Sequence, residues 1–317
     1  MHSRPLDRRS FLRGAVAGGA LLGLGMRSPL ALAADLSGKP RPGKIGDYKI
    51  SLAQWSLHKA LFSGKLDNLD FPKVAREEYG VDGVEYVNQF FKDKPRDSAY
   101  LKDLKKRAAD HGIANVLIMI DGEGDLSAPD KAARDQAVEN HKKWVDAAAE
   151  LGCHAIRVNT GNHYGPTDVA DAAEACGALS AYGAERKIHV ICENHGGPSS
   201  NPDALLALIK AVGSDNFGTL PDFGNFPKND GQYAIDVYEA IARMMPFAKG
   251  VSAKSYDFDE QGNESNLDFA RIMKIVTDAG YNGFVGIEYE GGRLSESDGI
   301  IATRKLLEKL RGSDYAG

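Results

Sequence analysis

Cysteine is scarce in this sequence of 317 residues, which contains only Cys153, Cys176 and Cys192. The number is odd, the three residues are scattered, and no C-x-x-C pair occurs. Two of them lie within apolar, strand-like runs, where cysteine is usually a small buried hydrophobic residue. The sequence therefore does not require a structural disulfide.

Motifs of nucleophilic and nucleotide chemistry are also missing. The sequence has no G-x-S-x-G elbow, no Walker-type phosphate loop and no H-E-x-x-H motif. It therefore gives no support for serine nucleophile chemistry or for nucleotide hydrolysis.

Positive charge is in deficit, because the formal net charge is −5 at pH 7. Residues 1–33 carry five arginines and one aspartate, so the chain without them would have a net charge of −9. A protein this acidic has no general attraction for phosphate backbones. We therefore expect no nucleic-acid partner.

The first 33 residues have the order of an export signal. Arg8 and Arg9 precede an apolar stretch over 14–26, and Ala31-Leu32-Ala33 offers a cleavage site. This pattern predicts a twin-arginine signal peptide and a periplasmic or otherwise exported protein. The alternative is a membrane anchor, but the stretch is short for the roughly 30 Å hydrocarbon core. We expect no stable anchor after cleavage.

A Pro-, Gly- and Lys-rich linker over 34–46 precedes the predicted domain, residues 47–317. The predicted domain is about as long as one α/β barrel. Short apolar runs alternate with longer amphipathic ones, a pattern typical of βαβ units and a parallel sheet. The strands are expected at 48–55, 81–87, 113–120, 154–159, 189–193, 217–222, 248–254 and 284–288. Helices are expected at 71–79, 98–111, 131–151, 168–187, 202–212, 233–245, 267–279 and 298–311.

Eight such repeats predict a (β/α)8 TIM barrel, an eight-stranded parallel sheet ringed by helices. The rival is a doubly wound open sheet, which needs a Gly-rich phosphate turn after its first strand. Residues 54–58, Gln-Trp-Ser-Leu-His, do not resemble such a turn. The barrel is therefore favoured.

Polar residues stand at the carboxyl ends of the apolar runs, where barrel enzymes place their active sites. They are Glu85, Asn159, Glu193, Asp222, Lys254 and Glu288. Glu193, Asp222 and Glu288 fall at the same level of three strands and form an oxygen-rich cage suited to a divalent cation. Alternation directs Ile191 inward with Glu193, and it places the small Gly286 beneath Glu288.

Four further residues have two interpretations each. His195 follows the fifth strand on a Gly-rich loop and is either a surface residue or a ligand for metal or substrate. His163 has a weaker claim of the same kind. Trp55 and Tyr86 at strand ends either stack on a sugar ring or pack in the core.

These motifs resemble the sugar phosphate isomerase/epimerase family, the xylose isomerase-like barrels, over the whole predicted domain. The matching stretches are Val84-Glu85-Tyr86-Val87, Ile191-Cys192-Glu193-Asn194-His195, Pro221-Asp222-Phe223-Gly224-Asn225 and Gly286-Ile287-Glu288-Tyr289-Glu290-Gly291. The resemblance implies a divalent metal, Mn²⁺ first and Mg²⁺, Co²⁺ or Zn²⁺ as alternatives. It implies Glu193, Asp222 and Glu288 as ligands. Two residues depart from the family pattern, since Ser252 and Asn225 stand where histidine is common. Ser252 or His195 would complete the metal shell.

The resemblance further implies proton transfer next to a carbonyl through an enediolate, with Glu193 and Glu288 as acid and base. Lys254 would stabilise a negative oxygen. The substrate would contact Glu85, Trp55, Arg157, Asn159, His195 and Asn225. Export favours a non-phosphorylated sugar, a cyclitol or a 3-keto-glycoside.

The expected activity is that of a sugar isomerase or epimerase. A lyase or dehydratase using the same site is the alternative, and a non-catalytic sugar-binding barrel is a second one. An endonuclease IV type of DNA repair enzyme would need more histidines and a basic face. The sequence leaves a homo-oligomer open.

Overall fold

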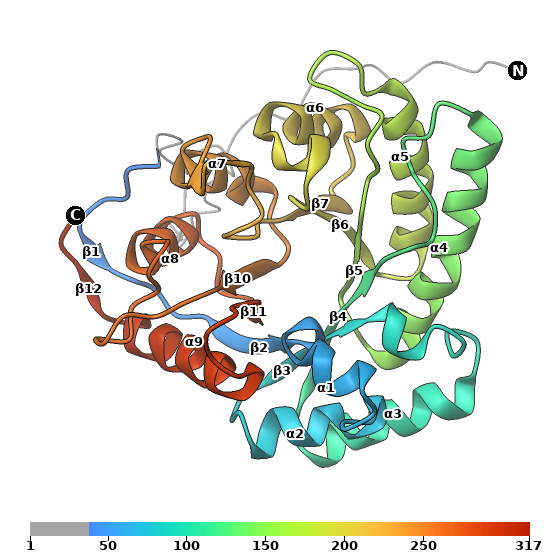
Figure 1. Cartoon of the computed structure of the whole chain (residues 1–317). Coiled ribbons are helices and arrows are strands. Elements are labelled where there is room, and N and C mark those ends of the chain that lie inside the picture. The colour runs from blue at the N-terminus through green and yellow to red at the C-terminus, as the bar shows by residue number, and fades with distance from the viewer. Residues whose placement is uncertain (1–37) are drawn as a thin grey trace, which may run out of the picture. The chain divides into compact units, whose positions relative to one another are not determined.

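The computed structural model describes residues 38–317, so the predicted signal peptide and residues 34–37 of the predicted linker lie outside the described residues. Eight parallel strands form the central sheet, in the order β10-β11-β2-β3-β4-β5-β6-β7. Figure 1 shows the helices arranged around the outside of this curved sheet. The predicted TIM barrel and its parallel sheet are confirmed.

The strands are short, as a barrel requires. Their bounds are β2 Lys49–Ala53, β3 Gly83–Val87, β4 Ala114–Ile120, β5 Ala155–Val158, β6 His189–Glu193, β7 Phe217–Leu220, β10 Val251–Ser255 and β11 Phe284–Tyr289. Two isolated parallel bridges, Thr219 to Ala248 and Asp222 to Ser252, join the β7 and β10 sides and close the ring. The closing bridge therefore lies at two residues of the predicted site.

The helices agree with the predicted ones to within a few residues in most cases. They are α1 His58–Phe62, α2 Phe71–Glu77, α3 Ser98–Asp110, α4 Lys131–Leu151, α5 Ala170–Glu185, α6 Pro202–Val212, α7 Val237–Met244, α8 Phe269–Asp278 and α9 Glu296–Leu310. Polar side chains cap several amino ends; Asp130, for example, accepts from the Ala133 amide at 2.9 Å. Gly152 ends α4 in the left-handed conformation, at φ 82°. Among residues 38–317, no helix has the length and hydropathy needed to cross a membrane.

The helix predicted at 233–245 is present, but it starts four residues later than predicted, at Val237. Residues Lys228–Asn229 (β8) and Gln232–Tyr233 (β9) instead pair as an antiparallel hairpin. Asp230 and Gly231 form its tip with φ of 49° and 81°, as a type I′ turn demands. The helix α7 starts only after Asp236, whose carboxylate accepts from the amides of Tyr238 and Glu239. The short helix α1, after a 3-10 turn at Gln54–Leu57, was not predicted.

The end of the predicted linker packs on the barrel. Gly43–Lys44 (β1) pairs with Asp314–Tyr315 (β12) in antiparallel fashion. Ile45 follows β1 and is only 1% exposed within the main hydrophobic cluster. The segment from Gly43 to Ile45 is therefore a packed part of the barrel domain.

The barrel interior contains a separate small apolar cluster. It includes Ala53, Val87, Leu117, Met119, Ala155, Ile191 and Leu220. Cys192 instead belongs to the larger cluster that contains the helices. The predicted alternation along β6, with Ile191 inside and Cys192 outside, is confirmed.

Because Ile45 is buried, we expect Ile45→Ala to lower the free energy of unfolding by about 2–5 kcal/mol, as for other buried aliphatic truncations. Urea denaturation measures the change. Lys44→Ala, at an exposed neighbour, serves as the control and should change stability by about 0.5 kcal/mol or less. Equal, small effects of both substitutions would show that the segment does not pack on the barrel.

Candidate functional site

Three buried carboxylates meet at the carboxyl ends of the strands. Glu193 ends β6, Asp222 lies two residues past β7, and Glu288 is in β11. One oxygen of each lies within 4.8 Å of the others, and the three residues are at most 3% exposed. The structure thus brings together the three acids that the sequence placed at one level.

Asp222 is held in place by the chain that follows it. Its Oδ1 accepts from the amides of Gly224 and Asn225, both at 2.8 Å. Burial raises the pKa of Asp222 well above its ordinary value, and the neighbouring Lys254 charge only partly opposes this. The backbone turn after β7 therefore fixes the carboxyl, while its burial favours the protonated form.

Ser252 lies between two of the acids. Its Oγ is 2.6 Å from Asp222 Oδ2 and 2.9 Å from Glu288 Oε2. A hydroxyl has one proton to donate, so it satisfies one of these oxygens as a donor. The other contact is a hydrogen bond only if that carboxyl donates to Oγ. Burial raises the pKa of Asp222 and so favours its protonated form, whereas Lys254 and Arg157 hold the pKa of Glu288 below its ordinary value.

Lys254 on β10 supplies a buried positive charge. Its ammonium donates to Glu288 Oε1 at 3.1 Å and to Glu290 Oε2 at 2.9 Å, and it lies 3.9 Å from Asp222 Oδ2. Burial alone would lower the pKa of Lys254, but the surrounding carboxylates raise it well above its ordinary value. Burial would likewise raise the pKa of Glu288, yet Lys254 and Arg157 hold it below its ordinary value. Lys254 and Glu288 therefore form a charged pair.

Glu193 is only partly satisfied by its neighbours. Its Oε1 accepts from Asn225 Nδ2 at 2.8 Å. Its Oε2 lies 2.8 Å from Arg157 Nε, but the two atoms are not aligned for a hydrogen bond, and both are left without a hydrogen-bond partner. Burial raises the pKa of Glu193, with the Arg157 charge opposing. A buried oxygen without a partner is costly unless a ligand satisfies it.

The donor set fits a hard divalent cation. Three carboxylates can each offer an oxygen to one ion, and Glu193 Oε2, although ion-paired with Arg157, accepts no hydrogen bond. The hydroxyl of Ser252 is a weaker ligand than a histidine nitrogen and is already engaged by two carboxyls. The site therefore suits oxygen-preferring ions such as Mg²⁺ or Mn²⁺ better than Zn²⁺.

A cavity of about 230 Å³ opens beside the triad; we call it the mouth cavity. Its lining comes from the ends of six consecutive strands of the ring: Trp55, Val87, Gln89, Met119, Asp121, Arg157, His195, Glu288 and Glu290. Trp55 donates through Nε1 to Glu290 Oε1 at 2.5 Å and stacks on His58. Arg157 donates to Asp121 Oδ1 at 2.9 Å. Polar groups thus surround a space large enough for a small polar ligand.

Several predicted site residues lie elsewhere. Glu85 does not line the mouth cavity, because its side chain bends down to Ser51 Oγ at 2.6 Å, beside Gly286. A Cβ at residue 286 would be 2.5 Å from Glu85 Oε1, so the predicted room under Glu288 is taken by this carboxyl. His195 lines the cavity but is exposed and is not part of the triad. Asn159 reaches the site through Asp121, to which it donates at 2.8 Å.

Two other candidates have structural roles. His163 contacts Asp125 Oδ2 at 2.8 Å on an exposed loop away from the mouth cavity. Tyr86 is fully buried and packs edge-on against Phe71 and Phe91 on the helix side of β3. Of the two interpretations for Tyr86, core packing is the one observed.

The sequence analysis missed two acids of the site, Asp121 and Glu290. Asp121 directly follows β4 and accepts from Arg157 and Asn159. Glu290 directly follows β11 and accepts from Lys254 and Trp55. The strand-end rule, which assigns polar residues at the carboxyl ends of strands to the site, also applies to these two acids. The sequence could therefore have indicated them.

Comparison with known proteins gives one family and several similar folds. Residues 74–310 match the family model described as xylose isomerase-like TIM barrel. A 71-residue stretch is 42% identical to the C-glycoside deglycosidase alpha subunit of Arthrobacter globiformis and covers 22% of this chain. The match spans only 20% of that protein's length.

Two solved structures show the same fold at low sequence identity. D-Psicose 3-epimerase with D-tagatose, from Clostridium cellulolyticum H10, superposes with a TM-score of 0.63 at 14% identity, over 82% of this chain and 97% of that one. A xylose isomerase-like TIM barrel protein from Mycobacterium smegmatis in complex with magnesium has a TM-score of 0.61 at 16% identity, over 84% and 98%. At these identities the similarity establishes the fold alone.

The buried Glu85 generates a pH prediction. Burial raises its pKa from 4.5 to about 8, so the folded protein binds one more proton than the unfolded chain between these values. The stability that the protonated Glu85 contributes to the folded state is fully present below about pH 4.5 and is lost as the pH rises toward about 8. Glu85→Gln, which stays neutral, should gain on the order of 3 kcal/mol of stability relative to wild type between about pH 5 and about pH 8.

Urea denaturation across this pH range measures the difference. Glu78→Gln, a substitution of the same kind at an exposed position, provides the control. Curves for wild type and Glu85→Gln that stay parallel with pH would show that Glu85 is ionised in the folded protein.

Proposed function

The chain belongs to the xylose isomerase-like TIM barrel family, and from this premise we propose that it moves a proton next to the carbonyl group of a non-phosphorylated carbohydrate, as a sugar isomerase or epimerase. The observation that carries the proposal is the different surroundings of two carboxylates of the triad, since Glu193 Oε2 has no hydrogen-bond partner whereas Glu288 Oε1 accepts from Lys254 at 3.1 Å. The pKa of Glu193 is raised and that of Glu288 is lowered. Two acids in one site with opposite shifts are the usual arrangement for acid–base chemistry.

The residues suggest distinct roles. Glu193 presents the oxygen without a hydrogen-bond partner and takes or returns the proton. Glu288, paired with Lys254 at 3.1 Å, stays ionised. Lys254 places a positive charge where an enolate oxygen develops negative charge. Arg157 and Asp121 line the mouth cavity and offer a donor and an acceptor to sugar hydroxyls.

Charge supports a substrate without phosphate. Six carboxyl groups surround or underlie the mouth cavity: Glu85, Asp121, Glu193, Asp222, Glu288 and Glu290. Arg157 is paired with Asp121 and Glu193, and Lys254 with Glu288 and Glu290. A phosphate dianion would have to displace one of these partners. A neutral sugar needs no such exchange, and export through the predicted twin-arginine signal also favours it.

We propose that a divalent metal, Mn²⁺ or Mg²⁺ first, is held by Glu193, Asp222 and Glu288. Such an ion, when bound, acts as a Lewis acid that polarises the substrate carbonyl. Ser252 keeps Asp222 and Glu288 oriented through its two contacts. Lys254 balances part of the negative charge of the set.

Elimination is the second candidate reaction, and the similarity to a deglycosidase alpha subunit favours it. Removal of the same proton from a keto-glycoside creates an enolate, which expels a leaving group on the next carbon instead of being reprotonated. The site residues are the same for both reactions. The outcome depends on whether the bound sugar carries a leaving group.

Proton removal can be measured directly. With a keto-sugar such as 3-keto-glucose in D₂O, we expect the wild-type protein to exchange deuterium into the position next to the carbonyl. Glu193→Gln should lower the exchange rate by about 10²–10⁴-fold, the range for loss of a general base. Glu78→Gln serves as the matched control. Binding of the sugar with no exchange in the wild type would leave a non-catalytic sugar-binding barrel.

Metal content tests the proposed cofactor. We expect near-stoichiometric Mn or Mg by mass spectrometry after metal-sparing purification, and loss of the metal in a Glu193→Ala/Glu288→Ala variant. Because burial favours the protonated form of Asp222 in the free site, we expect metal binding to release protons and to weaken as the pH falls. An unchanged metal content in the variant would contradict the assignment of the ligands.

A further inference from the structure

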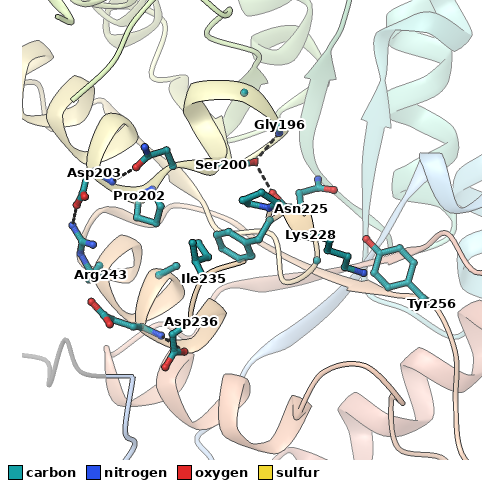
Figure 2. Close-up of a pocket in the computed structure, with 17 residues that line it drawn as sticks. Gly196, Ser200, Pro202, Asp203, Asn225, Lys228, Ile235, Asp236, Arg243 and Tyr256 are labelled. Atoms are coloured by element: carbon teal, nitrogen blue, oxygen red, sulfur yellow. Dashed lines mark hydrogen bonds and ion pairs between the residues drawn. The ribbon is translucent and has the colours of Figure 1, made fainter. Parts of the chain in front are cut away.

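A second, larger hollow of about 870 Å³ lies beside the triad, on the β6, β7 and β10 side of the barrel mouth. We call it the side hollow; Figure 2 shows its lining. The lining comes from Gly196–Gly197, the start of α6, residues 224–228, Ile235 with the start of α7, and Tyr256. Of these residues, only Gly224 and Asn225 contact the triad described above.

The side hollow adjoins the triad at Asn225. Asn225 lines the hollow and donates through Nδ2 to Glu193 Oε1 at 2.8 Å. Gly196 of the hollow directly follows His195 of the mouth cavity. Ser200 joins the two loops, since its Oγ accepts from the Gly196 amide at 2.7 Å and donates to the Asn225 carbonyl at 2.5 Å. The two spaces are therefore neighbours at the loops after β6 and β7.

The two spaces differ in size. The mouth cavity, at about 230 Å³, is smaller than the roughly 300–1,000 Å³ of ordinary ligand pockets, whereas the side hollow falls within that range. The mouth cavity suits one sugar ring. A group attached to that ring and directed past Glu193 would enter the side hollow.

The lining of the side hollow indicates the chemistry of that group. Phe226, Pro227, Ile235 and Ala240 provide apolar surface. The exposed Lys228 lies with its ammonium 4.5 Å from the centre of the Tyr233 ring and 5.0 Å from that of Tyr256. Lys228 has no ion pair with a carboxylate among residues 38–317, whereas Arg243, the second cation of the lining, does have one.

That other cation, Arg243, is paired with Asp203 at 2.5 Å. Asp236 is occupied as the cap of α7. Lys228 is thus the cation available to a ligand, next to apolar and aromatic walls. An aromatic ring bearing a neutral phenolic hydroxyl matches this combination, since the lining also holds the acids Asp203, Asp236 and Glu239.

We infer that the side hollow binds the aromatic aglycone of a keto-glycoside whose sugar ring occupies the mouth cavity. The inference rests on the proposed proton removal next to the carbonyl. In a 3-keto-glycoside, the proton leaves C2, its electron pair forms the C1–C2 double bond, and the C1–O bond to the aglycone breaks. The aglycone oxygen keeps the electron pair of the broken C1–O bond and takes up one proton, which balances the proton lost from C2. The products are a phenol and an unsaturated keto-sugar, with no net oxidation.

The substrate of this step already carries a ketone. A preceding oxidation of the glycoside at C3, by a dehydrogenase or oxidase class of enzyme, must therefore supply it.

The experiment compares two substrates on the full chain. Methyl 3-keto-β-glucoside has a sugar ring but no aromatic group, and 4-hydroxyphenyl 3-keto-β-glucoside has both. Deuterium exchange at C2 and release of the phenol are measured for each. We expect Ile235→Trp, which fills the hollow, to lower the ratio of kcat/KM for the aryl to the methyl substrate by about tenfold. Lys228→Gln should lower it about threefold, and Lys228→Arg should restore it.

Lys228 is exposed, so its variants keep the test valid if Ile235→Trp does not fold. Lys102→Gln, at an exposed lysine of α3, is the matched control. An unchanged ratio in both variants, with exchange intact in the wild type, would overturn this inference alone. Absence of exchange with either substrate in the wild type would overturn the proposed function and this inference with it. A ratio that falls only in Phe62→Ala would place the aglycone on the aromatic rim of Trp55, Phe62 and Phe90 and would also overturn it.

Discussion

The repulsion among Glu193, Asp222 and Glu288 is the constraint on which the site depends. Three carboxylates within 4.8 Å in a buried place cannot all be charged without compensation. The fold provides this compensation from different strands: Lys254 from β10, Arg157 from β5, and two amides from the turn after β7. Since these groups come from strands far apart in the sequence, only the closed barrel brings them together. The closing bridge between Asp222 and Ser252 makes barrel closure and site formation one event.

Much of the fold could be predicted because it follows from local patterns. Apolar strands of fixed period and helices with polar caps repeat eight times, and each repeat can be recognised on its own. The prediction was wrong at Tyr233, which has the composition of a helix start but belongs to a hairpin. There the Asp230-Gly231 turn, with both φ positive, decides the structure. Its strands are only two residues long, too short for an alternating pattern to be visible.

The part of the site that could be predicted is the part that a polar residue at a strand end indicates by itself. The strand-end rule grouped the three acids and Lys254, and applied more fully it also yields Asp121 and Glu290. It could not place Glu85, which lies in the middle of β3, Gly83–Val87, and not at its end. The position of its carboxyl depends on Ser51 of the neighbouring β2 and on the missing side chain at Gly286 of β11, the strand beyond β2. Side-chain direction in a barrel is thus a property of neighbours across the sheet.

Ser252 connects the electrostatics of the site with its chemistry. A histidine at this position would offer a nitrogen to a metal, whereas the hydroxyl of Ser252 is committed to Asp222 and Glu288. Burial favours the protonated form of Asp222, and a metal ligand set would have to displace that proton. We therefore expect this site to bind an ion less tightly than one with a histidine at residue 252. In the proposed reaction, an adjacent ketone acidifies the proton that Glu193 removes, and the side hollow adjoins the triad at Asn225, which donates to Glu193 Oε1. The contacts of Ser252 and the place of the side hollow therefore both bear on the keto-glycoside that we propose as substrate.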